Sequence, residues 1–239
     1  MSHSSDDRAD VRDMLVIHEA FRQSYRRMPE LVMGVAPGDV DRAAIVADHI
    51  QLMEQFLHLH HKGRDDLLWP KLLDRASERL GPAVALLERR HAEIATLMTD
   101  ASVRLAAWRR KPSAVYGTEL ADSLEKLGTR LAEHLATEER DVLPLVPDYV
   151  TAEEWHELGD HAIKGLPKNK LPIIFGMLAS LAEPEVVTLM LSAVPLVPRL
   201  IMPLLGPRAY ARHAQRVYER SQPPDAWTAG FFNAQSDAA

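Results

Sequence analysis

The chain has no cysteine among its 239 residues. This absence excludes disulfides, thiolate metal sites, iron–sulfur clusters and cysteine nucleophiles, so any bound metal must use nitrogen and oxygen ligands. Hydrolase motifs are also missing: there is no Gly-x-Ser-x-Gly elbow, no phosphate loop and no His-Glu-x-x-His pair. The opening MSHSSDDRADVRD lacks the apolar stretch of a secretory signal, and we therefore expect a cytoplasmic protein.

A net positive charge is found only towards the C-terminal end of the chain. Residues 164–220 hold eight Lys or Arg against three Asp or Glu, although the whole chain has a net charge of −6. The first 163 residues show no basic stripe with an accompanying motif, which argues against a nucleic-acid partner. A long uninterrupted apolar run is missing too. The 20 residues from Val186 to Leu205 contain three prolines and Arg199, so we expect no membrane span.

Four successive segments carry apolar residues at helical spacing. We predict helices over 10–30, from Asp39 or Asp41 to about 69, over 82–109, and from 114 to about 146. The breaks between them lie at Pro29 and 34–39, Pro70, Gly81-Pro82, 111–113 and Pro147. Because the joining segments are short, neighbouring helices should be antiparallel. The sequence therefore predicts an all-α fold, an up-down-up-down four-helix bundle.

The prolines of the last third indicate a different organisation. Short helices separated by proline residues should form a helical appendage on the bundle. We divide the chain into a disordered tail (1–9), the bundle (10–148), the appendage (149–225) and a loose tail (226–239). A homodimer, if the chain forms one, is expected to pair through the appendage.

One histidine lies near the middle of each predicted bundle helix: His18, His60, His91 and His134, with Glu138 one turn after the last. Bundle cores are mostly apolar, because a buried imidazole must find partners for both nitrogens. Four inward histidines can satisfy one another best through a metal ion, and we predict a metal site from these five residues. A purely structural histidine cluster is the alternative.

The second helix lacks the carboxylate that would match Glu138. The position four residues after His60 is Arg64. Arginine stays protonated, so the site is two charge units more positive than with a carboxylate, which disfavours a second metal ion. The neighbouring pair His61 and Asp65 lies about 100° around the helix. We expect His61, Arg64 and Asp65 to be substitute ligands or partners of the ligands.

The segments around these histidines resemble the hemerythrin-like, HHE cation-binding family over about residues 10–148. HLHHKGRDDLLWPKLL is similar to the family's second-helix motif, His-His-x-x-Glu-Asp followed by Leu-Trp-Pro, and HLATEERDVLPL to its fourth helix. The resemblance implies a non-heme di-iron centre held by histidines from four helices and bridged by carboxylates. It carries over to His18, His60, His91, His134 and Glu138, whereas Arg64 replaces the second-helix carboxylate. The LPKNKLP and GPRAYAR stretches resemble extensions of some actinobacterial-type members.

Our leading hypothesis is a hemerythrin-like iron protein that binds or reacts with O2, peroxide or nitric oxide. Because of Arg64, the expected cofactor is two non-heme irons, one, or none. One alternative is a mononuclear or metal-free bundle with a structural or interaction role. Another is an iron-dependent oxidoreductase that oxidises a small organic substrate. The ligands alone leave open whether the protein is an enzyme.

Overall fold

The computed structural model describes residues 8–192, 194 and 196–218. Within these ranges the regular elements are all helices, and the extended contact is an isolated bridge between Arg8 and Thr151. The all-α prediction is confirmed.

The bundle helices are α1 (Arg12–Met33), α2 (Val40–Gly63), α3 (Trp69–Arg110) and α4 (Ala114–Asp141). A π-helix, η2 (Arg64–Leu68), joins α2 to α3. The later elements are η3 (Leu143–Leu145), α5 (Val146–Tyr149), α6 (Ala152–Gly165), α7 (Leu171–Ala179), α8 (Pro184–Ser192) and α9 (Leu196–Tyr218).

Two compact units can be described separately. The first combines Phe21–Gly165 with the described residues before Arg12, and the second combines Arg12–Ala20 with the described residues from Leu166 onward. Our expected boundary at residue 149 stays a prediction, although α6 groups with the bundle and packs against α2. Ala9, which we assigned to the N-terminal tail, is buried and donates its N–H to the carbonyl of Val150. The predicted loose tail, 226–239, lies outside the described residues.

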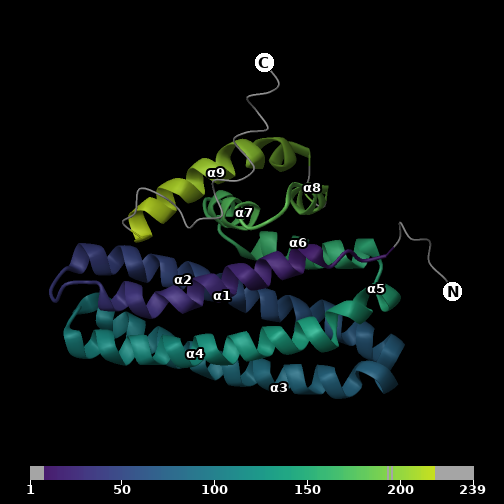
Figure 1. Cartoon of the computed structure of the whole chain (residues 1–239), viewed down its shortest axis with the longest axis horizontal. Helices are drawn as coiled ribbons and strands as arrows, with labels where there is room; N and C mark the ends of the chain where they lie inside the picture. Colours follow the sequence, from purple (N-terminus) through teal and green to yellow (C-terminus); the bar gives the residue numbers. More distant parts are fainter. Residues whose placement is uncertain (1–7, 193, 195, 219–239) are drawn as a thin grey trace. The chain divides into compact units, whose positions relative to one another are not determined.

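The bundle helices are antiparallel, as predicted, and run side by side in Figure 1. His61 of α2 stacks on His91 of α3, whereas Gln51, further back in α2, accepts a hydrogen bond from Arg109, further on in α3. Helices α3 and α4 are antiparallel in the same way, since residues later in α3 contact residues earlier in α4. The contacting pairs are Arg90 with Thr137, Asp100 with Ser123, and Arg104 with Glu119. The core between these helices is built from fully buried apolar side chains, each of which contributes roughly 1.5–3 kcal/mol.

Capping residues set two of the helix starts. The side chain of Asp39 accepts a hydrogen bond from the N–H of Arg42 at the start of α2, and Ser113 does the same for Tyr116 in α4. Gly38 precedes the first cap with φ of 86°, a backbone conformation that favours glycine. The starts predicted at Asp39 and after the 111–113 break are therefore confirmed.

The connection between the second and third helices differs from the prediction. We expected Pro70 to end or kink one helix and Gly81-Pro82 to start the next, but Pro70 lies in the first turn of α3 and Pro82 lies inside that helix. The break is at Ala76, with φ −147° and ψ 33°. The chain reverses there because Leu72 and Leu80, on either side of the break, are both buried in the core. Packing thus places the turn at Ala76, earlier in the chain than Gly81 and Pro82, which suggested a turn in the sequence.

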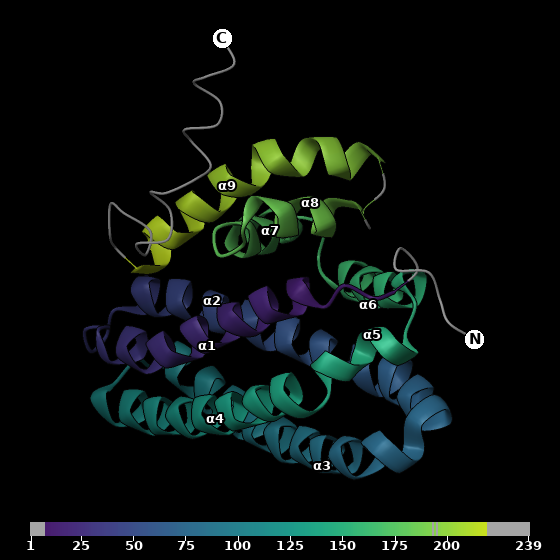
Figure 2. The ribbon, with the colours of Figure 1, turned by 45° about the vertical axis from the view of Figure 1, so that its right-hand side comes forward.

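In the second unit, α7 and α9 lie side by side (Figures 1 and 2). Their backbones meet at two glycines: a Cβ on Gly176 would overlap the carbonyl oxygen of Gly206. Only residues without a side chain allow this approach. The apolar run from Val186 to Leu205 is divided between α8 and α9. Among the described residues, no helix combines the length and apolar character needed to cross a bilayer.

Candidate metal centre

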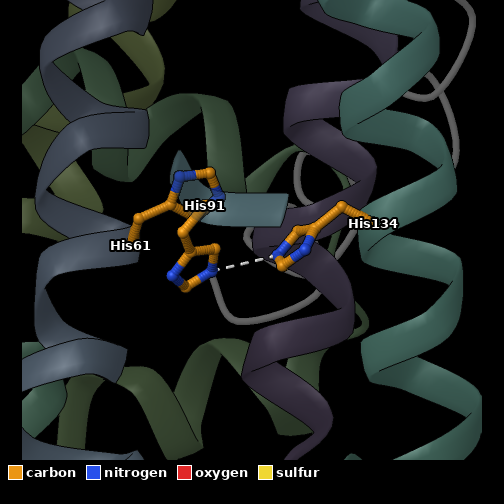
Figure 3. Close-up of side chains that lie close together, drawn as sticks. All are labelled: His61, His91 and His134. Atoms are coloured by element: carbon orange, nitrogen blue, oxygen red, sulfur yellow. Dashed lines mark hydrogen bonds between the residues drawn. The ribbon is translucent and has the colours of Figure 1, made fainter. Parts of the chain in front are cut away.

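Three buried histidines from three helices meet inside the bundle. His61 comes from α2, His91 from α3 and His134 from α4. One ligand nitrogen from each lies within 4.8 Å of the other two. Figure 3 shows the three rings converging from different helices. His91 and His134 belong to the set predicted from the sequence, whereas we had placed His61 among the substitute ligands or partners.

Hydrogen bonds orient two of these rings. Nε2 of His91 lies 3.2 Å from Nε2 of His134 (Figure 3), and Nδ1 of His91 lies 2.6 Å from Oδ1 of Asp65. The Asp65 contact directs the other ring nitrogen of His91 toward the interior, a common arrangement behind metal-binding histidines. The ring of His61 stacks on that of His91, with centroids 4.2 Å apart. Its Nε2 is buried and finds no hydrogen-bond partner among the described residues.

Burial lowers the pKa of His61 well below its ordinary value, and the neighbouring His91 and His134 lower it further. The His61 side chain is therefore a neutral imidazole at pH 7. A neutral imidazole with a buried, unpaired nitrogen is the form in which histidine binds a metal ion.

The π-helix follows directly after two consecutive buried histidines, His60 and His61. It inserts an extra residue into the turn, so the inward face shifts by one position downstream of it, where Leu68 is buried. The adjacent His60-His61 pair followed by Asp65 was the available sequence signal. A regular helix of period 3.6 gave no reason to turn both histidines inward.

Arg64 lies in the core, where the helix register had placed it. Its Nε donates to Oε1 of Glu138 at 3.0 Å, and its Nη1 donates to the carbonyl of His60 at 3.1 Å. Of the two side chains in this ion pair, 3% and 0% are exposed. The other carboxylate oxygen of Glu138 lies 3.6 Å from Nε2 of His134. The single carboxylate predicted to bind metal is thus already paired with a cation.

The remaining predicted ligands are also buried. His60 packs edge-on against Phe21, with ring centroids 5.1 Å apart, and its ring centroid lies 5.6 Å from that of His61. His18 is fully buried on α1, in the Arg12–Ala20 segment that groups with the second unit. The geometry within the first unit therefore concerns His60, His61 and the residues of α3 and α4.

A second polar group lies seven residues before His61 on α2. Glu54 is 8% exposed and accepts a hydrogen bond from Ser102 of α3 at 3.0 Å. Burial raises its pKa to about 7, while the Ser102 hydrogen bond lowers it. Its Oε1 and the buried hydroxyl of Tyr25 find no hydrogen-bond partner among the described residues. Sequence reasoning missed Glu54, because a single glutamate in a helix usually lies on the surface.

Comparison with known families gives a match over most of this unit. The model of the hemerythrin HHE cation binding domain matches residues 4–146. The chain belongs to this family. The hemerythrin HHE domain spans all four bundle helices and with them His61, His91, His134 and Glu138. No curated protein and no solved structure matched the chain.

The hemerythrin HHE domain is a metal-binding helical bundle, and the buried histidines of this chain are compatible with that role. Three imidazole nitrogens, one of them lacking a hydrogen-bond partner, form a donor set that suits divalent iron, cobalt or zinc. The residues present thus fit a bound metal ion. They fit a second ion less well, because Arg64 takes the position of a carboxylate.

Proposed function

We propose that this protein is a non-heme iron protein that binds or reacts with O2, peroxide or nitric oxide. The observation that carries the proposal is the cluster of His61, His91 and His134, three buried histidines from three helices. His61, His91 and His134 would hold ferrous iron, which would supply electrons to a small diatomic ligand or peroxide. The family match supports iron as the metal.

The side chains around the cluster favour small ligands. The histidines are enclosed by a bundle core of leucine, phenylalanine and tryptophan, which excludes bulk water. Asp65 holds His91 in one orientation. His61, neutral because of its burial, adds no charge that would repel a cation. Together these residues would hold the ion and fix its surroundings.

Three of the five residues predicted to bind metal lie outside the three-histidine cluster: His18, His60 and Glu138. All three are buried. Whether the protein holds one iron or two depends on the Arg64–Glu138 pair.

One cavity on the bundle does not favour the alternative of an enzyme for a small organic substrate. It has a volume of about 660 Å³, lies on α3 and α4 and is lined mainly by charged side chains. These are Asp122, Glu125, Lys126, Arg130 and Glu133. A small organic substrate would need a largely apolar pocket next to the histidines.

The proposed reactivity can be tested with anaerobically prepared protein loaded with ferrous iron. The absorption spectrum is followed after addition of nitric oxide, O2 or peroxide, each in a separate experiment. We expect a visible absorption band with at least one of them, and none with zinc-loaded protein, because zinc has no accessible redox change. An iron-loaded protein that is inert to all three would contradict the reactivity and leave metal binding intact.

A further inference from the structure

Two divalent ions a few ångströms apart need anionic ligands between them. In two-metal sites the ions lie about 3.5–4 Å apart, so their mutual repulsion is large unless carboxylates offset it. Among the described residues of the first unit, Glu138 is the fully buried carboxylate beside the histidines. One of its oxygens already accepts the 3.0 Å hydrogen bond from Arg64. A second metal ion would have to compete with the guanidinium for that carboxylate.

Arginine cannot withdraw from this competition by losing its proton, since its guanidinium stays charged in proteins. It is also held in place by the hydrogen bond to the carbonyl of His60. A metal ion bound to Glu138 would lie next to this fixed positive charge, in a core where little water can screen it. The guanidinium thus provides the positive charge that a second ion would otherwise bring.

The three-histidine cluster meets this conflict less directly, because its ligand atoms are imidazole nitrogens and not the carboxylate that Arg64 binds. Two nitrogens 3.2 Å apart, each about 2.1 Å from one ion, subtend roughly 100° at it, close to a tetrahedral angle. The Asp65 carboxylate behind His91 adds negative charge next to the cluster.

We propose that the chain binds one divalent transition-metal ion at His61, His91 and His134, and that Arg64, paired with Glu138, takes the place of a second ion. This inference rests on the proposed function, because it assumes that the bundle binds metal. The inference extends the proposed function by assigning the number of ions and the residue that sets that number.

The test measures metal content of the full-length protein. The protein is stripped with a chelator, incubated anaerobically with excess Fe(II), desalted and analysed for iron per chain. We expect about one ion per chain for the wild type and about two for Arg64→Glu, which restores a carboxylate. Lys62→Glu is the matched control: it makes the same charge change two residues earlier, on an exposed side chain, and should stay at about one.

A second pair of variants tests which residues bind the ion. His61→Ala should lower the iron content at least fivefold, because one of three ligands is lost. His58→Ala removes an exposed histidine of the same helix and should retain the wild-type content. Retention of about one iron in His61→Ala would overturn the assignment of the ion to the three histidines.

Spin counting on the wild type does not depend on whether a variant folds. Cobalt-loaded protein should show about one uncoupled high-spin Co(II) per chain by electron paramagnetic resonance. Two irons or two coupled cobalt ions in the wild type would overturn the single-ion proposal and leave the proposed function intact. No bound metal under any condition would overturn both.

Discussion

The guanidinium of Arg64 and the carboxylate of Glu138 form an ion pair inside the bundle, with 3.0 Å between Nε and Oε1. Neither side chain has access to water that could replace its partner, since 3% and 0% of their areas are exposed. Removing water from two charges costs free energy, and the attraction between them offsets much of that cost only while both are present. The pair therefore matters for stability as well as for metal content.

Removal of one partner should be far more costly than removal of both. In metal-free protein we expect Glu138→Ala to lower the free energy of unfolding by about 3–5 kcal/mol, because it leaves Arg64 charged and unpaired in the core. The double variant Arg64→Met with Glu138→Leu should recover most of that loss. Urea unfolding of chelator-treated protein measures both.

The exposed Lys62–Asp66 pair provides the comparison for the Arg64–Glu138 variants. It is also an ion pair of 2.7 Å, but its side chains are 49% and 43% exposed. Asp66→Ala should cost much less, because water screens both charges. A cost for Glu138→Ala no larger than that of Asp66→Ala would mean that the Arg64 side chain reaches solvent in the metal-free protein.

Asp65 should matter for metal affinity and little for metal stoichiometry. It accepts the hydrogen bond that orients His91, at 2.6 Å, and loss of such partners typically weakens metal binding 10- to 100-fold. We expect Asp65→Asn to weaken Co(II) binding by about that factor, measured by competition with a chelating dye. Asp66→Asn, one residue further on and exposed, should bind Co(II) like the wild type. Equal affinities in the two variants would contradict the orienting role.

Glu54 should make stability depend on pH. Its pKa is raised from 4.5 to about 7 by burial, so the folded protein keeps the carboxyl protonated where the unfolded chain ionises it. Its contribution to stability is therefore fully present below pH 4.5 and is lost as the pH rises to about 7, by up to about 3 kcal/mol. Glu54→Gln should remove this part of the slope.

Unfolding free energies at pH 5 and pH 8 measure the effect. The loss of stability from pH 5 to pH 8 should be smaller in Glu54→Gln than in the wild type. Glu125→Gln, an exposed change on α4, should leave the wild-type difference unchanged. Parallel pH profiles for the wild type and Glu54→Gln would show that Glu54 ionises in the folded protein as it does in the unfolded chain.

The glycine contact between α7 and α9 should not tolerate a methyl group. A Cβ on Gly176 would overlap the backbone of Gly206, and backbone cannot move aside as a side chain end can. We expect Gly176→Ala to destabilise this helix pair by about 1–3 kcal/mol or more, seen as faster hydrogen exchange in α7 and α9. Gly159→Ala in α6, where a Cβ meets nothing within 4 Å, should be neutral or stabilising.

Much of the bundle could be predicted from the sequence. The 3.6-residue spacing of apolar residues and the caps at Asp39 and Ser113 act locally, so they predict helices without knowledge of their neighbours. The breaks predicted at Pro29 and Pro82 were wrong, because both prolines lie inside helices. The inward positions of His91, His134, Glu138 and Arg64 followed from the same spacing, because a regular helix fixes which residues share a face.

The tertiary structure decided what depends on departures from that regularity. The π-helix at Arg64–Leu68 shifts the helix register directly after the buried pair His60 and His61, and no local propensity in the sequence predicts a π-turn. The chain reverses at Ala76 because the burial of Leu72 and Leu80 outweighs the preference of Gly81 and Pro82 for a turn. The Arg64–Glu138 ion pair joins residues 74 positions apart. Only the packing of two helices, which removes water from both charges, brings that pair together.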